Sequence, residues 1–189
     1  MESSQQKILA YCLKNSAFDG WNENLLKNAS LATGLDANYH KILFPAGVAD
    51  ILLFFAEETN RQMAESAVLP ANGVTAKIKA AVLYRLQLNQ PHKAAIKAAL
   101  KFYATSPLAA LKATYSAVDS IWRLIGDTST DFNFYTKRTL LAGVYSATIY
   151  YWLDDTSEGQ VKTAEFLDKR LAEVGQFNKF MAKVKGFRI

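Results

Sequence analysis

Apolar residues in this chain recur every three or four positions, and nowhere do they alternate with polar residues over a sustained stretch. A spacing of three to four matches the turn of an α-helix, whereas a half-buried strand needs a period of two. Residues 107–125 show the pattern most clearly, and their predicted buried face consists of Leu108, Leu111, Tyr115, Val118, Trp122 and Ile125. The sequence therefore predicts an all-α fold.

Prolines and short glycine-containing segments divide this pattern into about nine helices. We expect these helices at 4–17, 22–32, 36–43, 47–69, 74–89, 92–104, 107–125, 130–153 and 159–184. The first three are short and are joined by tight turns at Asp19-Gly20 and Thr33-Gly34, and a long helix follows Pro45. This order predicts a helix-turn-helix headpiece over residues 1–46 and a helical bundle over residues 47–189.

Charge is distributed unevenly, although the chain as a whole carries +5. Residues 1–60 contain four lysines and seven acidic residues, and the first arginine is Arg61. The helix that would enter the DNA groove, 36–43, offers only His40 and Lys41 as basic groups. Because phosphate contacts need Lys, Arg or helix termini, the headpiece is predicted not to bind nucleic acid.

Lysines form two further groups that could meet an anionic surface. Lys93, Lys97 and Lys101 lie at i, i+4 and i+8 of the predicted 92–104 helix. Such a ridge is either a solvated helix face or a surface attracted to anionic lipids or to an acidic partner. Near the C-terminus, Lys179 and Lys183 accompany apolar residues in a pattern typical of an interfacial helix. We therefore expect peripheral membrane contact through these lysines.

Residues that carry chemistry are sparse. The two histidines, His40 and His92, belong to neither an HExxH nor an ExxH spacing, and His92 is expected at the surface. No phosphate-binding glycine loop and no nucleophile motif occurs in the sequence. We predict a protein that is not an enzyme and that uses neither a metal nor a cofactor.

Signals for targeting are also missing from the sequence. The first residues are polar, with neither a secretory signal nor an Arg-rich transit peptide, and no apolar run reaches the about 18 residues of a membrane span. The single cysteine, Cys12, lies among Ile8, Leu9 and Leu13 and is expected in the core of a protein from a reducing compartment. We expect a bacterial cytoplasmic protein, with peripheral contact to the inner membrane.

The 130–153 helix is apolar almost all round from Leu140 to Leu153. A helix of this kind must be covered on several sides. One interpretation is that a second subunit or a lipid chain helps to cover this helix, and a second subunit would make the protein a homodimer. The alternative is that it is the central helix of a monomeric bundle.

The headpiece resembles the TetR-type regulators. The resemblance lies in Asp19-Gly20-Trp21, in Leu35-Asp36-Ala37-Asn38-Tyr39-His40 and in Leu43-Phe44-Pro45. It implies a TetR-like fold in which residues 36–43 are the recognition helix. One function compatible with it is that of a transcriptional repressor that senses a hydrophobic ligand.

A second resemblance is more specific. The run Gly126-Asp127-Thr128-Ser129-Thr130-Asp131-Phe132-Asn133-Phe134-Tyr135-Thr136-Lys137-Arg138, preceded by Asp119 and Trp122, resembles the family of the ninth protein of the coenzyme Q biosynthesis set. Weaker similarity extends from about residue 5 to about residue 175. The resemblance implies a non-catalytic accessory protein of ubiquinone biosynthesis. Its implied partners are an isoprenoid lipid or ubiquinone precursor and the di-iron hydroxylase that acts on demethoxyubiquinone.

The resemblance also implies site residues. Asp119 and Trp122 match the family's patch for binding the hydroxylase, and Arg123 is added as their neighbour on the helix; a plain core tryptophan is the alternative for Trp122. Gly126 suits the end of a helix, and Asp127, Ser129 and Thr130 are good capping residues for the next. Periodicity and analogy together give a lipid-binding set of Ile78, Val82, Leu86, Phe134, Leu141 and Tyr145. A structural subunit without a ligand remains a third function.

Overall fold

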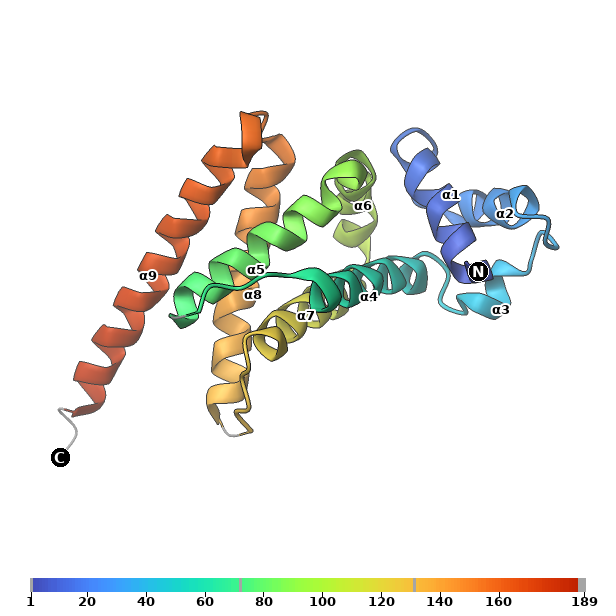
Figure 1. Cartoon of the computed structure of the whole chain (residues 1–189). Coiled ribbons are helices and arrows are strands. Elements are labelled where there is room, and N and C mark those ends of the chain that lie inside the picture. The colour runs from blue at the N-terminus through green and yellow to red at the C-terminus, as the bar shows by residue number, and fades with distance from the viewer. Residues whose placement is uncertain (1, 72, 131, 187–189) are drawn as a thin grey trace. The chain divides into compact units, whose positions relative to one another are not determined.

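The computed structural model describes residues 2–71, 73–130 and 132–186, together with the side chains of these residues except 132–133 and 177–186. All regular elements of these residues are helical, which confirms the all-α prediction (Figure 1). The elements are α1 (Ser4–Asp19), α2 (Glu23–Ala32), α3 (His40–Leu43), α4 (Val48–Ser66), α5 (Val74–Asn89), the 3-10 turn η1 (Gln90–His92), α6 (Lys93–Thr105), α7 (Pro107–Leu124), α8 (Phe132–Asp154), the 3-10 turn η2 (Glu158–Gln160) and α9 (Val161–Gly186).

Side-chain caps explain where the first helices begin and end. The Ser3 hydroxyl accepts from the Gln6 backbone N–H at 3.2 Å, and the Gln6 side chain accepts from the Ser3 N–H at 2.9 Å. This reciprocal pair satisfies two donors that an uncapped helix start leaves free. Asn22 caps α2 through the N–H of Leu25 at 3.0 Å. Local sequence therefore fixes these boundaries.

The predicted recognition helix is wrong in length, because α3 covers only His40–Leu43 instead of 36–43. Asp36 Oδ1 accepts the N–H of Asn38 at 2.8 Å, and the Asp36 carbonyl accepts the N–H of Tyr39 at 2.9 Å. These local bonds hold residues 36–39 in a turn and compete with helix formation, as Asp and Asn side chains commonly do.

The chain divides into two compact units by its contacts. Unit 1 comprises Met1–Glu65 and Gln87–Ala117, and unit 2 comprises Ser66–Leu86 and Val118–Ile189. The division predicted from the sequence, 1–46 and 47–189, separates a headpiece from a bundle and stays a prediction.

The core of unit 1 joins α1, α2, α4 and α6. Trp21 Nε1 donates to the carbonyl of Ala95 at 2.9 Å and so connects the headpiece to α6. Cys12 is fully buried, as expected, and burial raises the pKa of its thiol to about 12. The buried side chains of this cluster include Ile8, Leu9, Leu25, Leu26, Phe44, Ile51 and Leu52.

Unit 2 is built on α8 and α9, which lie side by side (Figure 1). The Tyr151 and Phe166 rings stack with centroids 4.4 Å apart, and Trp152 is completely buried. Tyr150 of α8 is 62% exposed in the single chain. Homodimer formation stays a prediction.

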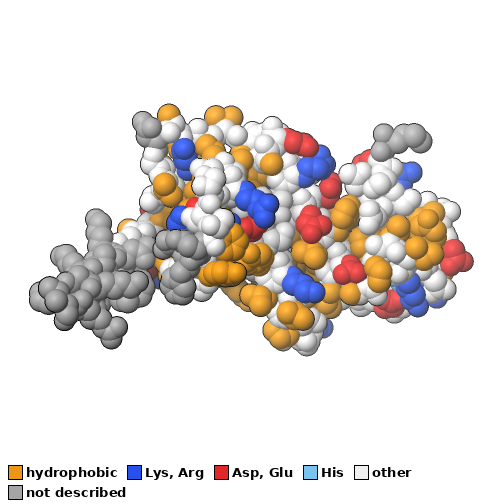
Figure 2. Space-filling view, turned by 90° about the horizontal axis from the view of Figure 1, so that it is seen from below, with side chains coloured by type: hydrophobic (Ala, Val, Ile, Leu, Met, Phe, Trp, Pro, Cys, Tyr) orange, Lys and Arg blue, Asp and Glu red, His pale blue; other side chains and the backbone are white. Residues whose placement is uncertain are grey.

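The buried face predicted for α7 is only partly correct. Val118 and Trp122 are buried, but Leu108, Leu111 and Tyr115 are 64%, 63% and 46% exposed. Periodicity shows which residues share a helix face, but it cannot show whether another element covers that face. On the side drawn in Figure 2, hydrophobic side chains form patches between charged ones.

None of the described helices combines the length and the apolar character required to cross a bilayer.

Candidate functional site

The α7–α8 corner begins with a tight helix end. The N–H of Asp127 donates to the Trp122 carbonyl at 3.0 Å, and the N–H of Gly126 donates to the Arg123 carbonyl at 3.0 Å. Gly126 has φ +87°, the left-handed conformation that this pair of bonds requires. The C-cap predicted from the sequence is therefore confirmed, and it turns Asp127 back toward α7.

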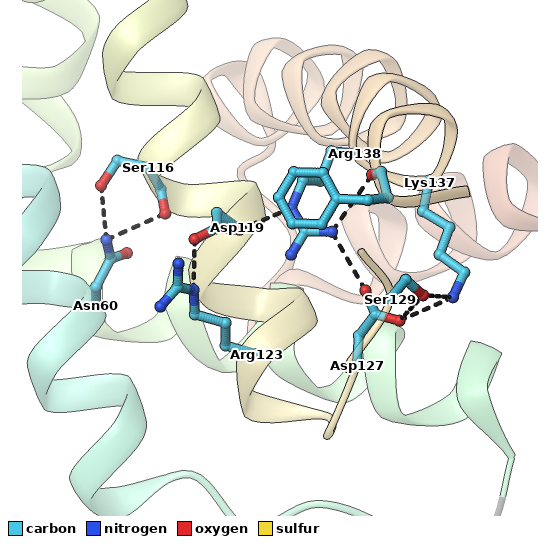
Figure 3. A network of polar contacts seen from close by, with 9 residues as sticks. Asn60, Ser116, Asp119, Arg123, Asp127, Ser129, Lys137 and Arg138 are labelled. Carbon is cyan, nitrogen blue, oxygen red and sulfur yellow. Dashed lines mark hydrogen bonds and ion pairs between the residues drawn. The ribbon is translucent and has the colours of Figure 1, made fainter. Parts of the chain in front are cut away.

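Arg138 is the centre of the corner (Figure 3). Its Nε donates to Asp119 Oδ1 at 2.7 Å, and its NH1 donates to Asp127 Oδ2 at 3.2 Å. The side chain is 4% exposed, and the Phe134 ring lies over it with 3.4 Å from Cζ to the ring centroid. A guanidinium stays charged in a protein, so its burial depends on these two carboxylates.

Asp127 accepts from two further donors, Lys137 and Ser129. Lys137 Nζ lies 2.8 Å from Asp127 Oδ1 and 2.7 Å from Ser129 Oγ, and the Ser129 hydroxyl donates to the same carboxylate oxygen at 2.7 Å. The hydrogen bond from Lys137, helped by those from Ser129 and Arg138, lowers the pKa of Asp127 to about 2 although burial acts to raise it. Asp127 is thus an ion-pair acceptor, a role that its capping chemistry did not indicate.

The predicted partner-binding residues meet at this network, but only one of them is strongly exposed. Arg123 is 75% exposed and donates to Asp119 Oδ2 at 2.6 Å (Figure 3). Asp119 is 14% exposed because it also binds Arg138. Trp122 is 8% exposed, and the Lys137 ammonium lies 5.4 Å from its ring centroid. Its Nε1 has no hydrogen-bond partner among the residues that the structure describes.

Sequence reasoning missed Arg138 and Lys137 as members of the site. Both stand in the run 126–138, and a basic pair directly after Tyr135-Thr136 was the available signal. Periodicity could not show that α8 places this pair opposite Asp119 and Asp127. These two acids stand more than two helix turns earlier in the sequence.

The predicted lipid-binding set lies in unit 2. Ile78, Val82, Leu86, Leu141 and Tyr145 are each at most 6% exposed. Phe134 differs from them because it is half-buried and lies against Arg138. Arg85 is also buried in this unit, and its Nε donates to the Tyr145 hydroxyl at 2.8 Å. The lipid-binding role of these residues stays a prediction.

In the headpiece, the basic groups of the would-be recognition helix are occupied. His40 is 1% exposed, and its Nε2 lies 2.8 Å from Glu23 Oε1. Lys41 Nζ lies 3.6 Å from the same oxygen. A buried imidazole cannot reach a base edge, which supports the prediction that this headpiece does not read DNA.

The predicted lysine surface is described only in part. On α6, Lys93 is half-buried, whereas Lys97 and Lys101 are exposed. Lys179 and Lys183 lie outside the residues whose side chains are described. His92, expected at the surface, is half-buried against the edge of Phe55, with ring centroids 5.7 Å apart. In the described part of the chain, no three His, Cys, Asp or Glu residues are grouped so that they could hold a metal ion.

The helical arrangement is that of TetR-type regulators. A TetR transcriptional regulator from Nitrosomonas europaea ATCC 19718 superposes with a TM-score of 0.64 over 91% of this chain and 98% of the regulator. The two sequences are 15% identical, so the likeness concerns the fold alone. It confirms the predicted TetR-like fold.

Sequence comparisons show that the chain is similar to the COQ9 family of ubiquinone biosynthesis proteins. Residues 108–178 match the model of the COQ9 family. The chain is 28% identical to the ubiquinone biosynthesis protein COQ9 of Drosophila melanogaster over 98% of its length, and 27% identical to that of Homo sapiens over 97%. It spans 60% and 61% of these relatives' own lengths. The resemblance found in residues 116–138 is thus confirmed.

The expected location in the bacterial cytoplasm is wrong. The relatives from Drosophila melanogaster, Dictyostelium discoideum and Homo sapiens are all named mitochondrial, which points to mitochondria and not to the bacterial cytoplasm. The error arose because composition and a single cysteine identify a reducing environment without distinguishing between compartments.

Proposed function

We propose that this chain is a non-catalytic accessory protein of ubiquinone biosynthesis. It acts in mitochondria, the location that the names of its relatives give. It binds an isoprenoid lipid or ubiquinone precursor among the apolar side chains of unit 2. It presents this molecule to a di-iron demethoxyubiquinone hydroxylase, which binds at the α7–α8 corner. The observation that carries the proposal is that the match to the COQ9 family, over residues 108–178, includes this corner.

The chemistry of the corner supports binding rather than catalysis. The carboxylates of Asp119 and Asp127 are engaged by Arg138, Arg123 and Lys137, so neither is a free general base. The corner presents an exposed guanidinium on Arg123, and beside it in the chain lies the buried indole N–H of Trp122, which has no partner among the described residues. Arginine and tryptophan are the residue types that most often dominate protein–protein binding energy.

Arg123→Glu is the variant that tests hydroxylase binding. Because Arg123 is 75% exposed, its reversal leaves the Arg138 ion pairs in place. We expect association with the hydroxylase, measured by calorimetry, to weaken at least about tenfold. Lys112→Glu is the matched control, since it makes the same charge reversal at an exposed site on the same helix. Equal binding by both variants would remove the corner from the proposal.

The indole N–H gives a finer test. Trp122→Phe keeps a six-membered aromatic ring and removes the pyrrole part of the indole with its unpartnered donor. If the hydroxylase brings an acceptor to this buried Nε1, affinity falls about two- to tenfold, while the cavity left by the smaller ring lowers the folded stability. Unchanged affinity would mean that Trp122 acts only through packing.

Lipid binding, the homodimer and membrane contact are separate parts of the proposal. Organic extraction of the purified chain followed by mass spectrometry should recover an isoprenoid lipid, and an empty extract contradicts the lipid-binding part. Sedimentation equilibrium measures the dimer. Flotation with anionic vesicles, compared between the wild type and Lys101→Glu, measures the contribution of the α6 lysines, with neutral vesicles as the control.

A further inference from the structure

A cavity of about 710 Å³ lies in unit 1, apart from the α7–α8 corner and from the predicted lipid-binding residues. Its walls come from α1, from α4 and from the segment that joins α5 to α6. This volume falls within the about 300–1,000 Å³ that is typical of small-molecule pockets. The proposed function does not use this space.

Specific contacts link the elements that form the walls of the cavity. Gln6 Nε2 donates to Glu58 Oε2 at 3.1 Å and links α1 to α4. Phe55 on α4 meets His92 of η1 edge to face, at 90° between the rings. Trp21 fixes α6 through the Ala95 carbonyl at 2.9 Å. A cavity with walls joined in this way exists before a ligand arrives, so binding costs little reorganisation.

Small and apolar side chains form most of the α1 wall, beside Gln6 and Lys14. Leu9, Ala10, Leu13 and Ala17 all line the cavity and follow one another at helical spacing. Ala10 and Ala17 leave room that longer side chains would occupy. Phe55 faces the cavity from α4. The combination of a flat ring and an aliphatic wall suits an aromatic ligand.

One buried amide at the cavity has unused hydrogen-bonding capacity. Asn89 lines the cavity and is 6% exposed. The Thr59 hydroxyl lies 3.2 Å from Asn89 Oδ1 and 3.0 Å from the Phe55 carbonyl. A hydroxyl has a single proton for these two acceptors, so the Asn89 amide keeps hydrogen-bonding capacity toward the cavity. A ligand with one hydrogen-bonding group would satisfy this amide.

The charged groups of the lining favour an uncharged ligand. They are Glu2, Lys14, Glu58 and Arg61, two acids and two bases. Glu58 already accepts from Arg61 at 3.1 Å, and Glu2 and Lys14 are exposed to solvent at the rim. Burial lowers the pKa of His92, so this imidazole adds no positive charge at neutral pH. With two acids and two bases the lining offers no net charge to compensate an ionic ligand, whose burial is costly.

We propose that this cavity is a binding site for a small uncharged aromatic molecule that packs between the α1 wall and Phe55 and pairs with the Asn89 amide. Such a site goes beyond the proposed function, since its lining residues all belong to unit 1, whereas the proposed isoprenoid site lies in unit 2. A ligand here contacts α1, α4 and the start of α6 together.

The test uses two fluorescent probes that differ by one charge. N-phenyl-1-naphthylamine is an uncharged aromatic amine, and 8-anilinonaphthalene-1-sulfonate is the same skeleton with a sulfonate. Each is titrated into the full chain with direct excitation of the probe. We expect the neutral probe to bind at least about tenfold more tightly than the sulfonate. Equal affinities would overturn the proposed ligand class.

Variants locate the probe. Ala10→Trp fills the cavity from an exposed position on α1 and should weaken binding of the neutral probe more than about tenfold. Ala104→Trp, an exposed alanine on α6 outside the lining, is the matched control and should change the affinity less than about twofold. Asn89→Leu should weaken binding about two- to tenfold through the lost hydrogen bond.

The proposal remains decidable if Asn89→Leu fails to fold, because Ala10→Trp changes an exposed residue and is checked by circular dichroism. Wild-type affinity in folded Ala10→Trp would show that the probe sits elsewhere and would overturn the site. Equal weakening of probe binding by Ala104→Trp and Ala10→Trp would also overturn the site.

Discussion

The turn before α3 and the corner between α7 and α8 both bury an ionisable side chain next to a short connection, but they compensate the burial differently. His40 is 1% exposed and is held by Glu23 at 2.8 Å and by the Ala37 carbonyl at 3.0 Å. Arg138 is 4% exposed and needs the two carboxylates of Asp119 and Asp127.

This difference follows from the chemistry of the two side chains. An imidazole has two ring nitrogens to pair, whereas a guanidinium carries a permanent charge. Removing His40 therefore costs hydrogen bonds and packing, but removing Arg138 takes from Asp119 and Asp127 the buried cation that they share. The comparison teaches that the corner is held by charge balance, whereas His40 is held by hydrogen bonds at both ring nitrogens.

The largest effect should come from Arg138→Met. Removing this guanidinium leaves Asp119 and Asp127 without their shared buried partner, and we expect the free energy of unfolding to fall by about 3–5 kcal/mol. Urea denaturation followed by circular dichroism measures the loss. Arg123→Met is the control, since Arg123 binds the same Asp119 carboxylate but is 75% exposed, and its loss should cost less than about 1 kcal/mol. Equal losses would show that burial does not decide the strength of these pairs.

A smaller loss is expected for His40→Ala in the headpiece. The substitution removes the bonds to Glu23 and Ala37 and opens a cavity beside Ser30, which should cost about 2–3 kcal/mol. The same denaturation experiment measures it. Lys41→Ala, which removes an exposed ion pair of 3.6 Å to the same glutamate, should change stability by less than about 0.5 kcal/mol. A loss in Lys41→Ala as large as that in His40→Ala would show that the buried hydrogen bonds of His40 do not dominate this turn.

Acid should weaken the corner through Asp127. Its pKa is lowered from 3.8 to about 2 in the folded protein, so its contribution is complete above pH 3.8 and is lost as the pH falls through about 2. The shift corresponds to about 2 kcal/mol. Denaturation of the wild type and of Asp127→Asn should show a stability difference that shrinks over this pH range. A difference that stays constant would mean that Asp127 has an ordinary pKa.

The smallest effects should come from two glycines with opposite signs. Gly126→Ala puts a side chain at φ +87° and should cost about 1 kcal/mol, although nothing lies within 4 Å of the added carbon. Gly143→Ala lies inside α8 with equally open space and should stabilise the chain by about 0.5–1 kcal/mol. Thermal unfolding of both variants checks the signs. A stabilising Gly126→Ala would mean that the α7 end does not need its left-handed residue.

Local sequence determined much of this protein. The spacing of apolar residues gave the helices, and Ser3, Asn22 and Gly126 gave several of their ends, because capping depends on residues within a few positions of one another. The run 126–138 by itself carries the resemblance to COQ9.

Tertiary structure decided which of these residues act together. No periodicity predicts that Arg138 reaches back to Asp119, that Trp122 is buried while Leu108 on the same helix is 64% exposed, or that Asn89 faces a cavity with α1 on its far side. Each of these facts depends on which distant segment covers a given helix face. The helix itself carries no information about its neighbours, since its period describes one face and not what packs against it.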